Sequence, residues 1–173
     1  GIFPSAAFSW NMKNEHWLKD TNAVSALKLR LSYGQTGQQD VSGNTIATYK
    51  YNTNASQYVF GNQFLYPITP LGYNADLKWE TTSQFNGGID LGMFNGRFPL
   101  TADGYYKRTD DLLQTKILAG SAGVYNPYVN MGAVSNSGFE LTLSGVPVLT
   151  KSIEWSVDAN ISLNRNRIVS IDP

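Results

Sequence analysis

The chain has 173 residues, of which 42% are hydrophobic, 13% are aromatic and only 15% are charged, and its formal net charge is zero. This aromatic content excludes a disordered chain, and without a basic stripe no nucleic-acid partner is expected. The absence of cysteine excludes a disulfide framework, a thiolate metal site and a cysteine nucleophile. No apolar run reaches about 18 residues, so the sequence holds no candidate transmembrane helix.

Alternation of apolar and polar residues predicts two strands in the first part of the chain, a weak one at 2–10 and a clear one at 25–33. The apolar set in the second strand is Leu27, Leu29, Leu31 and Tyr33, and the polar set is Lys28, Arg30 and Ser32. The linker at 14–20 is short enough for one helical turn.

A hairpin is predicted next, from strands at 80–92 and 97–109. The dipeptide Asn95-Gly96 lies between them, and it is a strong signal for a tight β-turn. Polar residues alternate with apolar ones on both strands. The apolar set is Phe85, Ile89, Leu91, Phe98, Leu100, Ala102 and Tyr106.

Two further strands are predicted at 137–147 and 153–164, joined by the short connection 149–152. The alternation in 153–164 is unbroken, so Val157 and Ile161 share an apolar face while Asp158 and Asn160 share a polar one. A length of about a dozen residues suits a tilted membrane-spanning strand, which needs roughly 9–11 residues.

The connections alternate between short turns and two long segments, at about 35–78 and 110–136. Short turns at one rim and long loops at the other are typical of an outer-membrane barrel, and aromatic residues near the strand ends fit its interfacial girdles. We therefore predict an all-β fold, a segment of a large antiparallel transmembrane β-barrel, with the long loops extracellular and the short turns periplasmic. The residues predicted to face the lumen are Lys28, Arg30, Glu80, Gln84, Asp90, Asp103, Glu140, Asp158 and Asn160. A soluble β-sandwich would alternate in the same way and remains the alternative.

Candidate catalytic motifs are weak. Ser25 and Lys28 match a Ser-x-x-Lys pattern, but on a strand the two side chains would point to opposite faces. His16 is the single histidine, so the chain cannot build a histidine metal cluster or a Ser-His dyad. The aspartates at 103, 110 and 111 lack calcium-loop spacing, and the glycines at 120 and 123 lack the lysine of a phosphate loop. We predict no enzyme activity, no metal site and no cofactor.

Aromatic residues in the long loops are the candidates for contact with a substrate or a partner, because flat rings with a polar tip are enriched at interfaces. Packing of the loops on one another is the alternative reading. The candidates are Tyr49, Tyr51, Tyr58, Tyr125 and Tyr128.

Five stretches in order resemble the C-terminal part of the barrel in SusC/RagA-like TonB-dependent outer-membrane transporters. They are LKLRLSYGQTG at 27–37, NADLKWETT at 74–82, YYKRTDDLL at 105–113, NMGAVSNSGFEL at 130–141, and Trp155 followed by Asn160, Ser162, Asn164 and Asn166. Gln38 and Ala75 depart from the family's usual Asn and Pro, which affects local loop geometry.

The resemblance implies a 22-stranded barrel in the outer membrane of a Gram-negative bacterium, filled by a plug and energised by the TonB complex. It also implies a SusD-like surface lipoprotein as partner and an oligosaccharide or oligopeptide as the imported nutrient. Residues 1–173 would then be a partial barrel domain within outer-membrane lipid, with the plug and TonB box outside this segment. The alternative function is a soluble all-β binding or adhesin module.

Overall fold

In the computed structural model of the chain, the described residues are 1–38, 51–52, 58–66, 68–72, 74–119, 121 and 127–171. The chain divides into two compact units. The first comprises Gly1–Thr36, Thr82–Thr109 and Val134–Val169, and the second comprises Gly37–Thr81, Asp110–Ala133 and Ser170–Pro173.

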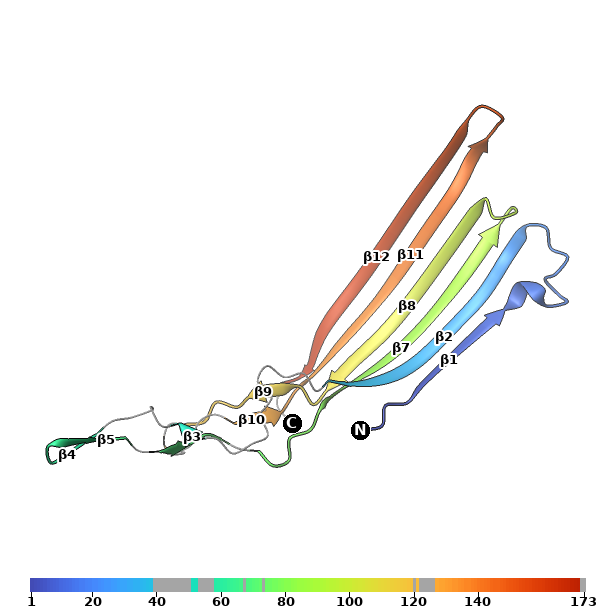
Figure 1. Cartoon of the computed structure of the whole chain (residues 1–173). Helices are drawn as coiled ribbons and strands as arrows, with labels where there is room; N and C mark the ends of the chain where they lie inside the picture. Colours follow the sequence, from blue (N-terminus) through green and yellow to red (C-terminus); the bar gives the residue numbers. More distant parts are fainter. Residues whose placement is uncertain are drawn as a thin grey trace. The chain divides into compact units, whose positions relative to one another are not determined.

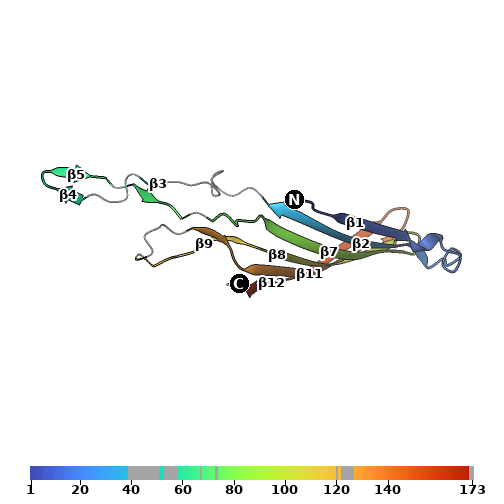
Figure 2. The same ribbon diagram turned by 90° about the horizontal axis from the view of Figure 1, so that it is seen from below.

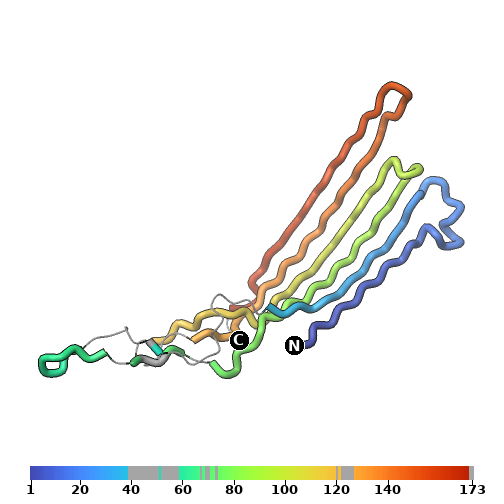
Figure 3. The backbone as a smooth tube through the Cα atoms, viewed as in Figure 1, coloured from blue at the N-terminus to red at the C-terminus, as the bar shows by residue number. Residues whose placement is uncertain are grey.

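The first unit is built on one six-stranded sheet whose strand order follows the chain (Figure 1). The strands are β1 (Ser5–Asn11), β2 (Val24–Gln38), β7 (Glu80–Met93), β8 (Phe98–Asp110), β11 (Ala133–Leu149) and β12 (Glu154–Ser170). The short connections β1–β2, β7–β8 and β11–β12 all lie at the same end of the sheet (Figure 3), which we call the short-turn end. The opposite end, from which the chain leaves β2 and β8, is the long-connection end. The six predicted strands and the two predicted short connections, at 95–96 and 149–152, are confirmed.

Strand register aligns apolar with apolar and polar with polar residues. Phe8 lies opposite Leu31 in the β1–β2 pair, and Glu140 lies opposite Asp103 in the β8–β11 pair. Because side chains alternate along each strand, the sheet has a polar face and an apolar face.

The sheet is a single layer (Figure 2). Among the described residues, Ala133 is the one hydrophobic residue that is buried, whereas Phe85, Ile161 and Leu163 are 51%, 58% and 64% exposed. A β-sandwich would bury such a face against a second sheet. Within the described part of the chain no second sheet covers it, so the apolar face needs a covering from outside this segment.

Two aromatic rings of β8 lie across glycines of β11. A Cβ added to Gly138 would come within 2.5 Å of the Tyr105 ring, and one added to Gly145 would come within 2.6 Å of the Phe98 ring. Tyr105 and Gly138 are register partners. A glycine opposite an aromatic residue lets the ring lie flat over the neighbouring strand, which helps to fix the register.

The short connections are stabilised locally. In the β7–β8 turn, Phe94, Asn95 and Gly96 have φ of 50°, 59° and 82°, a left-handed conformation that Asn and Gly tolerate best. In the β1–β2 connection a 3-10 helix spans Met12–Asn14. It begins two residues earlier than the linker 14–20 in which a helical turn was predicted. The ammonium group of Lys13 donates to three backbone carbonyls further along this connection, at distances of 2.9–3.1 Å.

The described residues of the second unit form three short two-stranded sheets. They pair β3 (Tyr51–Asn52) with β6 (Thr69–Pro70), β4 (Tyr58–Phe60) with β5 (Gln63–Leu65), and β9 (Leu113–Thr115) with β10 (Tyr128–Asn130). The sequence predicted loops in these regions, so the short strands are a correction. They contain only two or three residues each, too few for an alternation pattern to be visible.

Strand boundaries also differ from prediction, and β2 continues to Gln38 rather than ending at 33. β11 begins at Ala133 rather than 137, and β12 continues to Ser170 rather than ending at 164. The prediction stopped where the apolar row ends, at Leu163, but the extended backbone continues through Arg165 and Arg167. No helix in the described residues is long and apolar enough to cross a membrane.

Candidate functional site

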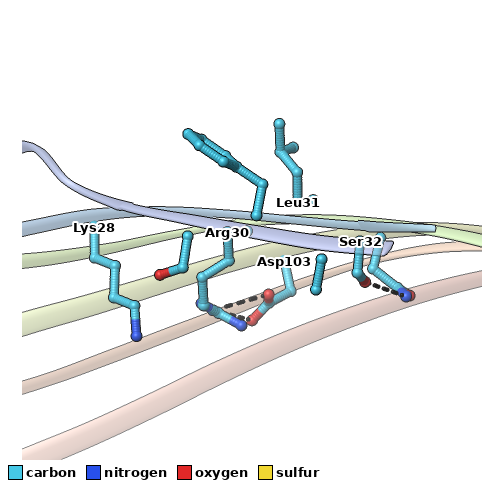
Figure 4. A pocket seen from close by; sticks show the side chains of 11 residues that line it. Lys28, Arg30, Leu31, Ser32 and Asp103 are labelled. Atoms are coloured by element: carbon cyan, nitrogen blue, oxygen red, sulfur yellow. Dashed lines mark hydrogen bonds and ion pairs between the residues drawn. The ribbon is translucent and has the colours of Figure 1, made fainter. Parts of the chain in front are cut away.

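A charged cluster links three strands on the polar face. Arg30 of β2 donates from Nε and Nη2 to the two carboxylate oxygens of Asp90 on β7, both at 2.9 Å. Its Nη2 also lies 3.0 Å from Asp103 Oδ1 on β8. Figure 4 shows the guanidinium group directed at Asp103, with Leu31 pointing to the opposite side of the sheet. One arginine therefore joins two carboxylates from two strands.

The cluster is partly open to solvent. The Arg30, Asp90 and Asp103 side chains are 38%, 37% and 38% exposed. Charges in such a position are screened by water and salt, so each ion pair stabilises the fold only modestly. The two carboxylates outnumber the single guanidinium, and the cluster remains able to attract a cation or a hydrogen-bond donor.

Gly88 of β7 makes room for this cluster. It is buried, and a Cβ placed on it would overlap Asp103 Oδ1 and come within 2.9 Å of Arg30 Nη2. Any larger residue at Gly88 would displace the Asp103 carboxylate and crowd the guanidinium group of Arg30. The Gly87-Gly88 pair inside a strand pattern is a sequence signal for a close approach of this kind, but no prediction was based on it.

Two hollows lie at the cluster or near it on the sheet. One, of about 330 Å³, includes Lys28, Arg30, Ser32, Asn86 and Asp103 in its lining (Figure 4). Another, of about 560 Å³, is lined by polar groups of four neighbouring strands. Its lining is Gln84, Asn86, Tyr105, Lys107, Thr109, Val134, Asn136, Glu140 and Asn166. Asn136 Oδ1 in this second hollow is buried and has no hydrogen-bond partner among the described residues.

The residues predicted to face a lumen are distributed along this face with one exception. Strand register and hydrogen bonds place six of them together on β2, β7, β8 and β11: Lys28, Arg30, Gln84, Asp90, Asp103 and Glu140. Asp158 and Asn160 are exposed on β12 and alternate with its apolar row. Glu80 has a separate role, because its Oε1 accepts a hydrogen bond of 2.9 Å from the backbone N–H of Leu113.

The second unit has a polar centre around Asn130 that was not predicted from the sequence. The side chain of Asn130 accepts a 2.6 Å hydrogen bond from the backbone N–H of Lys78 and donates a 2.7 Å bond to its carbonyl oxygen. It also donates to the carbonyl oxygen of Asp111 at 2.9 Å. Asn74 donates to the carbonyl oxygen of Tyr128 at 3.3 Å. The side-chain amides of Asn74 and Asn130 therefore join the two long connections through hydrogen bonds to backbone groups, as the backbone bonds of a β-ladder would.

The tyrosine candidates are only partly described. Tyr51 on β3 is 63% exposed and Tyr128 on β10 is 36% exposed. The backbone of Tyr58 lies in β4. Tyr49 and Tyr125 lie outside the described residues. Tyr51 and Tyr128 therefore present rings that are available for a contact.

Comparison with known proteins identifies this sheet. A family model described as "TonB dependent receptor-like, beta-barrel" matches residues 1–170. The chain belongs to the TonB-dependent receptor β-barrel family. Members of this family are outer-membrane β-barrel proteins, so the chain is part of such a barrel and a soluble module is not favoured.

Individual relatives agree with this assignment. The TonB-dependent receptor SusC of Bacteroides thetaiotaomicron is 39% identical over 174 residues, a match that covers 99% of this chain and 17% of SusC. A solved structure of the RagAB peptide transporter is 30% identical, with a TM-score of 0.77 over 98% of this chain and 18% of the other. The RagAB peptide importer in its "open-open" state gives a TM-score of 0.79 at the same identity and coverage. These relatives are receptors and transporters rather than enzymes, and the chain spans less than a fifth of their length.

Proposed function

We propose that the complete protein imports a glycan or a peptide across the outer membrane through a barrel to which this chain contributes six strands. The observation that carries the proposal is the opposite polarity of the two faces of a single-layer sheet. In a barrel the apolar face contacts lipid and the polar face lines the interior. The similarity to SusC and to the RagAB peptide transporter supports an import function for this architecture.

The polar face would line the lumen. The Arg30–Asp90–Asp103 cluster and the two adjacent hollows offer donors and acceptors at fixed positions on the barrel wall. A plug or a polar solute could use these groups for hydrogen bonds. Asp158 and Asn160 would extend this lining onto β12, and Glu80 would support the long connections rather than the wall.

The partners follow from the same proposal. The exposed rings of Tyr51 and Tyr128 suit stacking on sugars or packing against a SusD-like lipoprotein cap. Energy would come from the TonB complex through regions outside this chain, and the apolar face would be covered by outer-membrane lipid. The long connections would then be extracellular and the short turns periplasmic.

Cysteine labelling of intact cells tests the orientation. Asn62 lies in the exposed turn of the β4–β5 hairpin and Asn95 lies in the exposed β7–β8 turn. In the full-length protein, a membrane-impermeant maleimide should label Asn62→Cys and should leave Asn95→Cys unlabelled until the cells are opened. The reverse pattern would show that the long connections face the periplasm.

Uptake by cells that produce the full-length protein tests the function. Labelled oligosaccharides and oligopeptides should enter by a route that a protonophore abolishes, and one class should be preferred. The Tyr51→Ala/Tyr128→Ala variant should lower uptake, while its heat-dependent gel shift stays that of a folded barrel, because loop residues carry little of the fold. Absence of uptake of either class by a folded, surface-displayed barrel would contradict the proposal.

A further inference from the structure

A cluster of arginines interrupts the apolar face near the long-connection end. On β12 the apolar row runs from Trp155 to Leu163, and the next two positions on the same side are Arg165 and Arg167. Arg108 of β8 lies on this side as well, two residues from Tyr106. The three arginines share one hollow of about 370 Å³, whose lining is Tyr106, Arg108, Ser135, Ser137, Arg165, Arg167 and Val169.

The position of this cluster is fixed by strand register. Arg108 of β8 lies opposite Ser135 of β11. The next pair, Thr109 with Val134, is the last described pair of this ladder. The cluster therefore lies at the edge of the apolar face. From Trp155 to Arg165, a rise of about 3.3 Å per residue and a strand tilt of about 40° give a height of about 25 Å, the height of the apolar band of a membrane barrel. Arg165 and Arg167 would thus reach the level of the lipid headgroups.

The chemistry of the hollow is that of an anion site. Its described lining contains three guanidinium groups and no carboxylate, and it adds hydroxyl groups from Tyr106, Ser135 and Ser137. A guanidinium group presents a planar fork of donors that matches the oxygens of a phosphate. Arg108 has other contacts within the chain, so Arg165 and Arg167, both exposed, carry the inference.

We propose that Arg165 and Arg167, with Arg108 beside them, bind the phosphate-bearing headgroup of a lipid in the outer leaflet. The inference rests on the proposed membrane orientation, which puts the long-connection end outside the cell. The continuity of the hollow with the apolar face favours a lipid, because the acyl chains would lie along Leu163 and Ile161 while the headgroup meets the arginines. A soluble anion would gain nothing from that apolar surface.

Lipid binding by the full-length protein in a neutral detergent tests the proposal. Purified protein is titrated with lipid A that carries its phosphate, with dephosphorylated lipid A, and with inorganic phosphate, and complexes are counted by native mass spectrometry. The phosphate-bearing lipid should bind, and Arg165→Gln/Arg167→Gln should weaken its binding by about tenfold or more, since two charge-assisted contacts are lost. Dephosphorylated lipid should bind the wild type as weakly as the phosphate-bearing lipid binds the variant.

Matched variants separate charge from position. Lys19→Gln/Lys151→Gln removes two exposed positive charges from the short-turn end and should leave lipid binding unchanged. Arg165→Lys/Arg167→Lys keeps the charge but loses the planar fork, and should bind with intermediate strength. This second variant also serves if the glutamine variant does not fold, as judged by the heat-dependent gel shift.

Three results would overturn the inference. The first is equal binding of phosphate-bearing lipid A by the wild type and both arginine variants. The second is equal binding of inorganic phosphate and lipid, which would show an anion site without a lipid. The third is loss of a co-purifying lipoprotein in the arginine variants with lipid binding intact, which would show a protein contact. A full-length protein that shows no gel shift would contradict the membrane proposal itself, and is thereby distinguished from failure of this site.

Discussion

The polar face and the apolar face of the same six strands hold their side chains in different ways. On the polar face, side chains from different strands bond to one another: Arg30 joins Asp90 and Asp103, and Asn86 donates to Ser32 at 3.0 Å. On the apolar face, register partners such as Phe8 and Leu31 lie opposite each other but remain 56% and 37% exposed. Neighbouring residues of one strand therefore have specific partners on one side of the sheet and, among the described residues, no covering layer on the other.

This difference determines which substitutions each face tolerates. A polar interior accepts new polar or charged groups, because water and neighbouring polar side chains can solvate them. It is sensitive to steric changes at a crowded cluster. A lipid-facing surface tolerates changes of shape but not of charge, since hydrocarbon offers a charge no partner.

Substitution by arginine at adjacent positions of β12 should give the largest contrast. Ile161 lies midway between Trp155 and Arg167 on the apolar side, and Asn160 faces the other way. Ile161→Arg should cost about 2–4 kcal/mol, the penalty for a charge near the bilayer midplane, and Asn160→Arg should cost much less. The measurement is a urea titration of the full-length barrel refolded into vesicles. Equal costs at the two positions would show that the two sides of β12 do not face lipid and lumen.

A second contrast comes from two adjacent glycines. A Cβ on Gly88 overlaps Asp103 and crowds Arg30, whereas a Cβ on Gly87 meets Leu31 Cδ2 at an ordinary 3.4 Å. Gly88→Ala should therefore cost about 1–3 kcal/mol through overpacking. Gly87→Ala should be neutral or slightly stabilising, because alanine reduces the freedom of the unfolded chain. The same urea titration measures both variants, and a larger loss for Gly87→Ala would mean that the polar cluster tolerates displacement.

The sequence was sufficient to predict the six strands of the sheet and its two faces. Both features follow from alternation within each strand, as in 153–164, and that signal is local. The predicted strand boundaries were less accurate where charged residues replace apolar ones although the backbone stays extended. β12 continues as a strand through Arg165 and Arg167, where charged residues replace the apolar row.

The partners across the sheet could not be predicted. Arg30 is separated from Asp90 by 60 residues and from Asp103 by 73. Their meeting depends on strand order and register after a long connection, and alternation does not specify either one. The same holds for Asn130, whose partner Lys78 is 52 residues away. A side-chain amide bonded to a backbone leaves no periodic pattern in the sequence.

The smallest expected effect distinguishes the two carboxylates of the polar cluster. Asp90 receives two guanidinium hydrogen bonds at 2.9 Å and a 3.3 Å bond from the Thr101 hydroxyl. Asp103 contacts Arg30 only through Nη2, which lies 3.0 Å from Asp103 Oδ1. Asp90→Asn should therefore destabilise the barrel by up to about 1 kcal/mol, the range of partly exposed ion pairs. Asp103→Asn should cost less, since the remaining bidentate pair stays intact.

A double-mutant cycle with Arg30→Gln isolates these pair energies from other effects of each substitution. The coupling between Arg30 and Asp90 should exceed the coupling between Arg30 and Asp103, and both should shrink as salt is raised, because the pairs face water. Salt-independent coupling would mean that the cluster is shielded from solvent in the complete barrel, for example by a plug. Equal coupling energies for the two aspartates would contradict this expectation. They would mean that the bidentate pair of Arg30 with Asp90 is no more stable than the contact of its Nη2 with Asp103.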